Sequence, residues 1–168
     1  MTISMYQASI PAYLRMLSNT KVLLEKGAAF CALKKIEESI LINGRLAPDM
    51  FPLSRQVQIA TDFAKGSTAR LAGLEIPKYD DNEKTFADLI ARIDKTMAFV
   101  NTVTAAQIDG QEDREINLTI GGKPINFKGQ AYLIHFVLPN FHFHLAMLYA
   151  ILRHNGVEVG KSDFLGGV

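Results

Sequence analysis

The sequence predicts an all-α fold, a four-helix bundle with short extra helices and a small β-hairpin inserted before the last helix. Two observations carry this prediction. Three long segments have apolar residues at helical spacing and a fourth is apolar all round, and one short segment alternates polar and apolar residues around two adjacent glycines. Two strands alone are marginally stable, so the hairpin must pack on the helices or on a partner. The 168 residues suffice for one core, and we expect one domain spanning residues 1–168.

The first half of the chain predicts two long helices separated by a short helical region and a loop. Residues 6–26 carry an apolar stripe, and Gly27 is expected to stop or bend this helix. Residues 28–42 mix charged and apolar side chains, which predicts one or two short amphipathic helices that end at Asn43 and Gly44. Two prolines make residues 45–53 an ordered loop, and Pro52 suits the first position of the second long helix.

The middle of the chain predicts a linker, a third helix and the hairpin. Residues 73–82 form the linker, and Thr85 with Asp88 then has the spacing of an N-terminal capping box. An apolar stripe follows over residues 86–100. Residues 115–120 and 123–128 each alternate polar and apolar side chains, and the glycine pair between them suits a tight turn.

The last fifth of the chain is apolar and holds every histidine of the protein. Residues 129–152 contain no Asp, Glu, Lys or Arg. A segment of this length is a membrane span, a buried bundle helix, or a buried helix that lines a metal or ligand site. Three histidines, Asn140 and a central Pro139 all penalise insertion into a bilayer, so we expect no membrane association. The histidines are His135, His142, His144 and His154.

Composition excludes several classes of protein. The formal net charge is +1 and the basic residues are scattered, which argues against a nucleic-acid partner. Cys31 is the only cysteine, so there is no intramolecular disulfide and no cysteine-based zinc site. A lone cysteine favours a reducing, cytoplasmic location, and the N-terminal residues lack the pattern of a secretory signal.

Helical geometry limits which polar residues of the last segment can act together. Successive residues turn by about 100°, so His142 and His144 point roughly 200° apart and cannot share one metal ion. Asn140 and His144 lie about 40° apart and can converge on a metal, and His135 shares a face with His142. Pro139 removes a backbone donor and can kink the helix just before this cluster.

Residues 138–156 resemble the last bundle helix of the DinB/YfiT-like superfamily. That helix has the approximate pattern His-x-x-His-His-x-Gly-Gln, followed by Leu-x-x-Leu-Leu-Arg-x-x-Gly. When the chain is aligned on Leu152, Arg153 and Gly156, the two metal-binding positions of the superfamily fall on Asn140 and His144. The resemblance therefore implies that one histidine ligand is kept and one is replaced.

The same resemblance implies a third ligand, a histidine on the second helix. Residues 53–71 contain no histidine, and the polar residues available there are Gln56, Gln58 and Asp62. The implied metal site is therefore degenerate. A divalent ion such as zinc or nickel is the cofactor that the resemblance suggests, but the loss of two ligands favours no bound cofactor.

A closer resemblance, over nearly the whole chain, is to a bacterial family within this superfamily, the domain of unknown function DUF1993. It rests on the loop over residues 45–53, the run Gln-Val-Gln-Ile-Ala over residues 56–60, the segment Leu-Pro-Asn-Phe-x-Phe-His ending at His144, and the segment Leu-Arg-His-Asn-Gly-Val over residues 152–157. The chain is identified as a member of that family, which implies the bundle fold but no particular reaction.

The candidate site has two readings. His144 either ligates a metal with Asn140 and a residue of the second helix, or it is a buried histidine hydrogen-bonded to a neighbour. The second reading is favoured because amide side chains are weak ligands for zinc-like ions. The ligand-pocket candidates are Asn140, His144, Gln56, Asp62, His142 and His135.

Two classes of function follow from these readings. The first is a small-molecule-binding or non-catalytic bundle with a degenerate metal site. The second is a divergent metal-dependent transferase or hydrolase that uses His144. Superfamily precedent implies a homodimer, and the many aromatic residues of the last helix suit a face that contacts a partner. We favour the binding bundle because two of the three expected ligands are absent.

Overall fold

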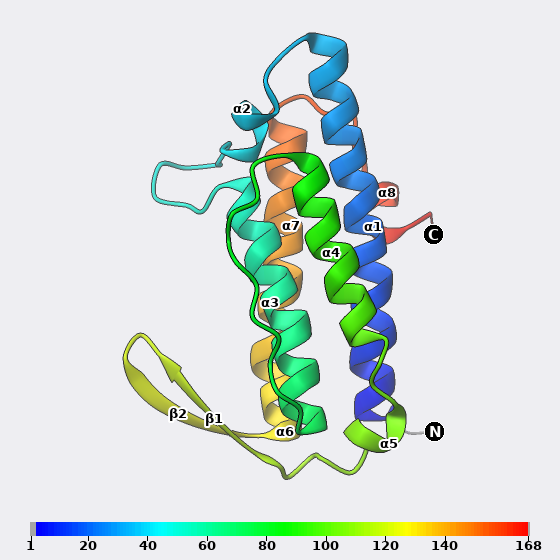
Figure 1. Cartoon of the computed structure of the whole chain (residues 1–168), viewed down its shortest axis with the longest axis vertical. Helices are drawn as coiled ribbons and strands as arrows, with labels where there is room; N and C mark the ends of the chain where they lie inside the picture. Colours follow the sequence, from blue (N-terminus) through cyan, green and yellow to red (C-terminus); the bar gives the residue numbers. More distant parts are fainter. Residues whose placement is uncertain (1–2, 168) are drawn as a thin grey trace.

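The computed structural model describes residues 3–167 and shows a four-helix bundle, as the sequence predicts (Figure 1). The long helices are α1 (Met5–Lys34), α3 (Leu53–Ala72), α4 (Phe86–Val100) and α7 (Leu138–His154). Helix α1 packs on α4, α4 packs on α3, α3 packs on α7, and α7 closes the ring against α1. One apolar core fills the space between them.

Short elements lie at both ends of the bundle. Helix α2 lies at the end where α3 begins, and the hairpin lies at the opposite end, where it extends to one side of the helices (Figure 1). The short elements are α2 (Glu38–Ile42), α5 (Ala105–Ile108), β1 (Glu115–Ile120), β2 (Lys123–Lys128), α6 (Gly129–Ala131) and α8 (Lys161–Leu165).

Residues 74–85 form an extended connection, here called the strap, that runs back along the bundle from the end of α3 to the start of α4 (Figure 1). Helices α3 and α4 therefore point in the same direction. Arg92 of α4 holds the strap, because its guanidinium donates to the Asp80 carbonyl oxygen at 3.2 Å and to the Glu83 carboxylate at 2.8 Å. The strap corresponds to the predicted linker.

The expected stop or bend at Gly27 is wrong, since α1 continues to Lys34. Gly27 is buried, and a Cβ atom there would lie 2.9 Å from the Phe86 ring and 3.1 Å from the Leu152 side chain. The glycine therefore lets α4 and α7 approach α1 closely. The helix ends instead at Lys35, whose backbone is left-handed.

The predicted helix cap and hairpin are both confirmed. The Thr85 hydroxyl accepts from the Asp88 amide, and the Asp88 carboxylate accepts from the Thr85 amide. Strands β1 and β2 pair in antiparallel register, from Glu115 opposite Lys128 to Ile120 opposite Lys123. The two turn glycines both have positive φ angles, which suit a two-residue hairpin turn.

The last helical segment is not a regular α-helix. A π-helix, η1 (Tyr132–Val137), separates α6 from α7, and Pro139 lies in the first turn of α7. Because η1 runs directly into α7, the Leu138 amide still donates to the Leu133 carbonyl oxygen, whereas Pro139 has no amide hydrogen to donate. Within residues 3–167, the stretch Gly129–His154 alone is long and apolar enough to cross a membrane, a property shared by buried helices of bundles.

Candidate functional site

His144 lies between α7 and α3, where it contacts Gln56. Its Nδ1 atom is 2.7 Å from the Gln56 Oε1 atom, and its ring stacks on Phe63 at a centroid distance of 6.1 Å. The Gln56 amide also donates to the Phe51 carbonyl oxygen, which orients Oε1 toward the histidine. Because Oε1 can only accept, Nδ1 carries the imidazole proton.

Asn140 does not join His144 in a hydrogen-bonded pair. Its Nδ2 atom donates to the Phe136 carbonyl oxygen at 2.6 Å. In an α-helix the Phe136 carbonyl oxygen would accept from the backbone amide of residue 140. Here it lies in the π-helical segment, close to Pro139, and proline has no amide hydrogen. The Asn140 side chain thus supports the irregular helix, and its bond is local.

Asp62 faces α4 and the strap. Its Oδ1 atom pairs with Arg92 Nη2 and with Lys65 Nζ, each at 2.9 Å. His135 and His142 are exposed on the outer side of η1 and α7. Partial burial still lowers the pKa of the His142 imidazole. The structure therefore brings together Gln56 and His144, and it places the other four predicted site residues elsewhere.

These residues do not fit the metal site that the superfamily resemblance implies. Of the side chains proposed as ligands, His144 offers only its Nε2 lone pair, because Nδ1 carries the proton. Asp62 is held at α4 and the strap by two cations on Oδ1, and Asn140, whose Nδ2 donates to a backbone carbonyl, offers only an amide oxygen, a weak ligand for zinc-like ions. Among residues 3–167, no three His, Cys, Asp or Glu side chains cluster closely enough to hold a metal ion. One imidazole does not make a zinc-like site.

Burial of His144 predicts a pH-dependent stability. Burial, with the charge of Arg55 nearby, lowers the pKa of the His144 imidazole below its ordinary value of 6.5. As pH falls below that value, the unfolded chain binds a proton that the folded chain resists, so the free energy of unfolding decreases. Urea unfolding at about pH 7.5 and about pH 5.5 measures this loss, which the His144→Gln variant should reduce. An equal loss of stability in the wild type and in the variant would contradict this prediction.

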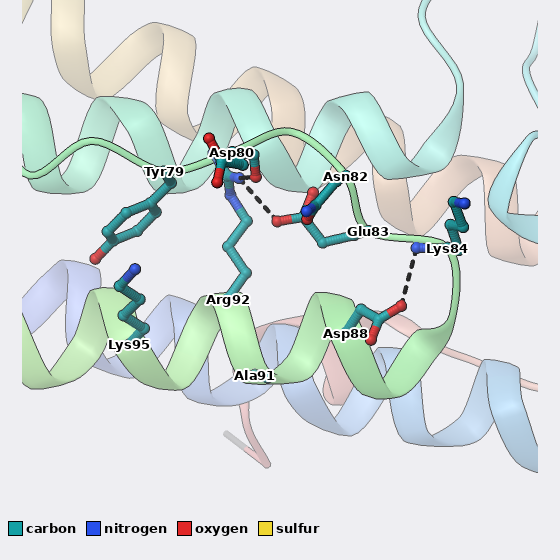
Figure 2. A pocket seen from close by; sticks show the side chains of 9 residues that line it. All are labelled: Tyr79, Asp80, Asn82, Glu83, Lys84, Asp88, Ala91, Arg92 and Lys95. Carbon is teal, nitrogen blue, oxygen red and sulfur yellow. Dashed lines mark hydrogen bonds and ion pairs between the residues drawn. The ribbon is translucent and has the colours of Figure 1, made fainter.

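A cavity of about 450 Å³ lies between the strap and α4 (Figure 2). Arg92 extends across it from α4 to the strap, and the Asp88 carboxylate accepts from the Lys84 amide (Figure 2). The cavity is lined by Tyr79, Asp80, Asn82, Glu83, Lys84, Asp88, Ala91, Arg92 and Lys95.

The polar groups around this cavity hold the strap in place. The Tyr79 ring has three cations around it, Lys95 Nζ at 4.2 Å, Lys65 Nζ at 4.9 Å and the Arg92 guanidinium carbon at 5.3 Å. Cations over a tyrosine face stabilise the contact. Arg92 also donates to the Thr61 hydroxyl of α3. We therefore interpret this region as a structural clamp between α3, α4 and the strap.

A second cavity, of about 350 Å³, lies where the hairpin meets α3 and η1, and we call it the hairpin pocket. Its walls combine an acid, an arginine, aromatic rings and one strand. Of the six predicted ligand-pocket residues, Asp62 is among its lining residues and the other five are not. The lining residues are Asp62, Phe63 and Arg70 of α3, Asn117, Leu118, Thr119 and Ile120 of β1, and Tyr132 and Phe136 of η1.

Aromatic side chains form one wall of the hairpin pocket. The Phe136 ring lies 5.6 Å from Phe63, 6.0 Å from Tyr132 and 5.3 Å from Phe127 of β2, between ring centroids. The π-helix places Tyr132 and Phe136 on this side, and π-helical turns are frequent at functional sites. Packing of Phe127 on these rings fixes the hairpin against the bundle.

Arg70 is the functional candidate that sequence patterns missed. Its Nη1 atom donates to the hydroxyl of the buried Tyr132 at 3.1 Å. Burial raises the pKa of that hydroxyl, although Arg70 partly offsets the effect. Arg70 forms no ion pair with any acidic side chain in residues 3–167. It belongs to no motif, and its only sequence signal is that it follows Phe63 by seven residues on one helix face.

The comparisons with known proteins agree with the fold. The family model for the domain of unknown function DUF1993 matches residues 5–165. The crystal structure of a DinB family member protein from Shewanella denitrificans is 39% identical, with a TM-score of 0.87, and the match covers 97% of this chain and 92% of that chain. No curated protein is significantly similar. The chain therefore belongs to the DUF1993 family and has the DinB-like bundle fold.

Proposed function

We propose that this protein is a dimeric, non-catalytic bundle that binds a small organic molecule in the hairpin pocket and retains only a degenerate metal site. The observation that carries the proposal is Arg70, a cation at the pocket that no acidic side chain in residues 3–167 neutralises. His144 and Asn140 make their hydrogen bonds within the protein and do not line this pocket.

The dimensions and chemistry of the pocket support binding of a small ligand. Its volume of about 350 Å³ falls within the usual range for small-molecule sites. Such sites are mainly apolar with a few oriented polar groups, and bundles often place them between facing helices. A cytoplasmic location, supported by the single buried thiol of Cys31, would give access to metabolites.

A ligand screen tests the proposal. Ligand-observed NMR with a panel of small aromatic acids, alcohols and amines should identify compounds that bind the wild-type protein. The Thr119→Trp variant, which places an indole in the pocket, should lose this binding. The Ser18→Trp variant alters an exposed position of α1 and should keep it. If no compound binds, or if both variants bind equally well, the proposed function is wrong.

The outer face of η1 and α7 supports the homodimer. Only 33% of the most apolar 18-residue window of this helical stretch is buried, and Ile134 and Phe143 are 43% and 52% exposed. His135, Pro139 and His142 are exposed beside them. In a two-fold dimer a patch contacts itself, so a face without Asp, Glu, Lys or Arg avoids repulsion between like charges that are permanent at neutral pH.

Phe143→Glu is expected to shift the protein from dimer to monomer. The substitution places one carboxylate from each subunit in the apolar interface, and each would lose solvent on association. Light scattering after size exclusion measures the mass. Leu33→Glu is the matched control, because Leu33 is 78% exposed on α1 and lies outside the proposed interface. A wild-type protein that is already monomeric, or a variant that stays dimeric, contradicts this interface.

A further inference from the structure

We propose that the hairpin pocket binds a small planar organic acid that carries a hydrogen-bond donor at the end opposite its carboxylate, as in a 4-hydroxyaryl carboxylate. This inference rests on the proposed function and specifies the ligand of the same pocket. Three features of the pocket carry it: the position of Arg70, the aromatic wall, and an uncommitted oxygen atom of Asp62.

Arg70 is placed to bind the carboxylate. Its Nη1 atom lies 2.8 Å from the position that a Cβ atom on Gly66 would occupy, so the guanidinium folds back over the preceding turn of α3. Within residues 3–167, one of its five N–H donors is hydrogen-bonded, to the Tyr132 hydroxyl. A guanidinium binds carboxylates through paired hydrogen bonds, and a partly desolvated one is a stronger partner than an exposed lysine.

The aromatic wall is suited to a flat apolar body. Phe136 stacks with both Phe127 and Tyr132, with interplanar angles of 29° and 27°. Phe63 meets the Phe136 ring edge-on at 66°. A flat ring in the pocket can therefore stack or pack edge-on, which are the preferred aromatic geometries. Leu118 of β1, which packs on the core, contributes apolar surface from the hairpin.

Asp62 supplies an acceptor at the other end of the pocket. Lys65 and Arg92 both bind its Oδ1 atom, and no hydrogen bond from residues 3–167 reaches Oδ2. The side chain is 41% exposed, and it lines the hairpin pocket. The two cations balance the charge of Asp62, which reduces its repulsion of an anionic ligand. A ligand hydroxyl can donate to this oxygen.

The spacing of these groups selects a short ligand. Asp62 and Gly66 are one turn apart on α3, which is about 6 Å along the helix axis. The Arg70 guanidinium lies over Gly66, so its donors and the Asp62 acceptor are separated by a similar distance along α3. A single benzene ring with para substituents matches this spacing when it lies parallel to α3, with its carboxylate beside Arg70 and its donor beside Asp62. Longer acids would project past one of the two groups.

Calorimetric titration with 4-hydroxybenzoate, benzoate and 4-hydroxybenzamide tests the inference. We expect 4-hydroxybenzoate to bind most tightly. Arg70→Gln should weaken it at least tenfold and should weaken the neutral amide much less, because only the carboxylate loses a hydrogen bond between two charged groups. Benzoate, without the donor, should bind roughly three- to tenfold more weakly than 4-hydroxybenzoate. Arg45→Gln, which alters an exposed loop arginine, is the control and should leave the affinities for all three compounds unchanged.

The outcomes separate this inference from the proposed function. Equal binding of the amide and the acid, or an unchanged affinity in a folded Arg70→Gln protein, overturns the anion specificity. Failure of all three probes also overturns it, even when other compounds of the NMR panel bind in a manner sensitive to Thr119→Trp. In that case the pocket still binds small molecules. If the whole panel fails, the proposed function fails as well.

Discussion

Replacement of Arg92 by methionine is expected to lower the free energy of unfolding by about 3–5 kcal/mol. The Arg92 side chain is 2% exposed, and the Glu83 carboxylate that it binds at 2.8 Å is 8% exposed. Methionine would leave that carboxylate buried without its cation and would remove the Arg92 contacts of Asp62 and Thr61. The strap would then lose its main attachment to the bundle. Urea unfolding of the wild type and variant measures the difference.

A second substitution separates the cost of the uncompensated carboxylate from the cost of lost packing. The double variant Arg92→Met, Glu83→Gln should recover much of the loss, because the remaining amide is neutral. Lys21→Met breaks the more exposed pair with Asp94 and should change stability by about 0–1 kcal/mol. A loss for Arg92→Met as small as that of Lys21→Met would contradict the interpretation of this cluster as a clamp.

Gly129→Ala is expected to destabilise the protein by about 1–3 kcal/mol, the usual cost of overpacking. Gly129 is buried where β2 passes into α6, and a Cβ atom there would lie 2.2 Å from the Gln111 carbonyl oxygen. A backbone oxygen cannot move aside by rotation of a side chain. The adjacent amide of Gln130 donates to the Glu112 carbonyl oxygen, so the backbone of residues 111–112 is in contact with both Gly129 and Gln130.

The effect of this overpacking should be largest in the hairpin. Hydrogen exchange should accelerate at the amides of β1 and β2, and ligand binding in the hairpin pocket should weaken, because the hairpin forms one of its walls. Gly160→Ala is the matched control, since the nearest atom to its added Cβ would be the Ser162 hydroxyl oxygen at 3.8 Å. Equal stability and equal exchange in the two variants would show that the close approach at Gly129 has no role in anchoring the hairpin.

Local patterns in the sequence predicted most of the fold. The apolar stripes located the long helices, the capping residues Thr85 and Asp88 located the start of α4, and the glycine pair located the hairpin turn. Gly27 was predicted wrongly because glycine is a common helix terminator. Its actual role depends on Phe86 and Leu152, residues distant in sequence, whose packing no local pattern reveals.

The candidate site was predicted less completely because its contacts are long-range. The hydrogen bond between His144 and Gln56 joins residues that are 88 positions apart. Both residues were candidates, but their pairing depends on how α3 and α7 pack. The residues of η1 are as apolar as those of a buried α-helix, so the hydrophobic periodicity of the sequence could not show on which side of the helix Tyr132 and Phe136 lie. Arg70 follows no motif, and its significance is apparent only once the hairpin lies beside it.

The metal content of protein purified without an affinity tag tests most directly whether this bundle has a degenerate metal site. Elemental analysis should be made on the wild type and on His144→Ala, with zinc and nickel measured in both. We predict far less than one ion per chain in each protein, since no three His, Cys, Asp or Glu side chains cluster closely enough among residues 3–167 to hold an ion. One ion per wild-type chain that is lost in His144→Ala would contradict the proposal and would establish a metal site at His144.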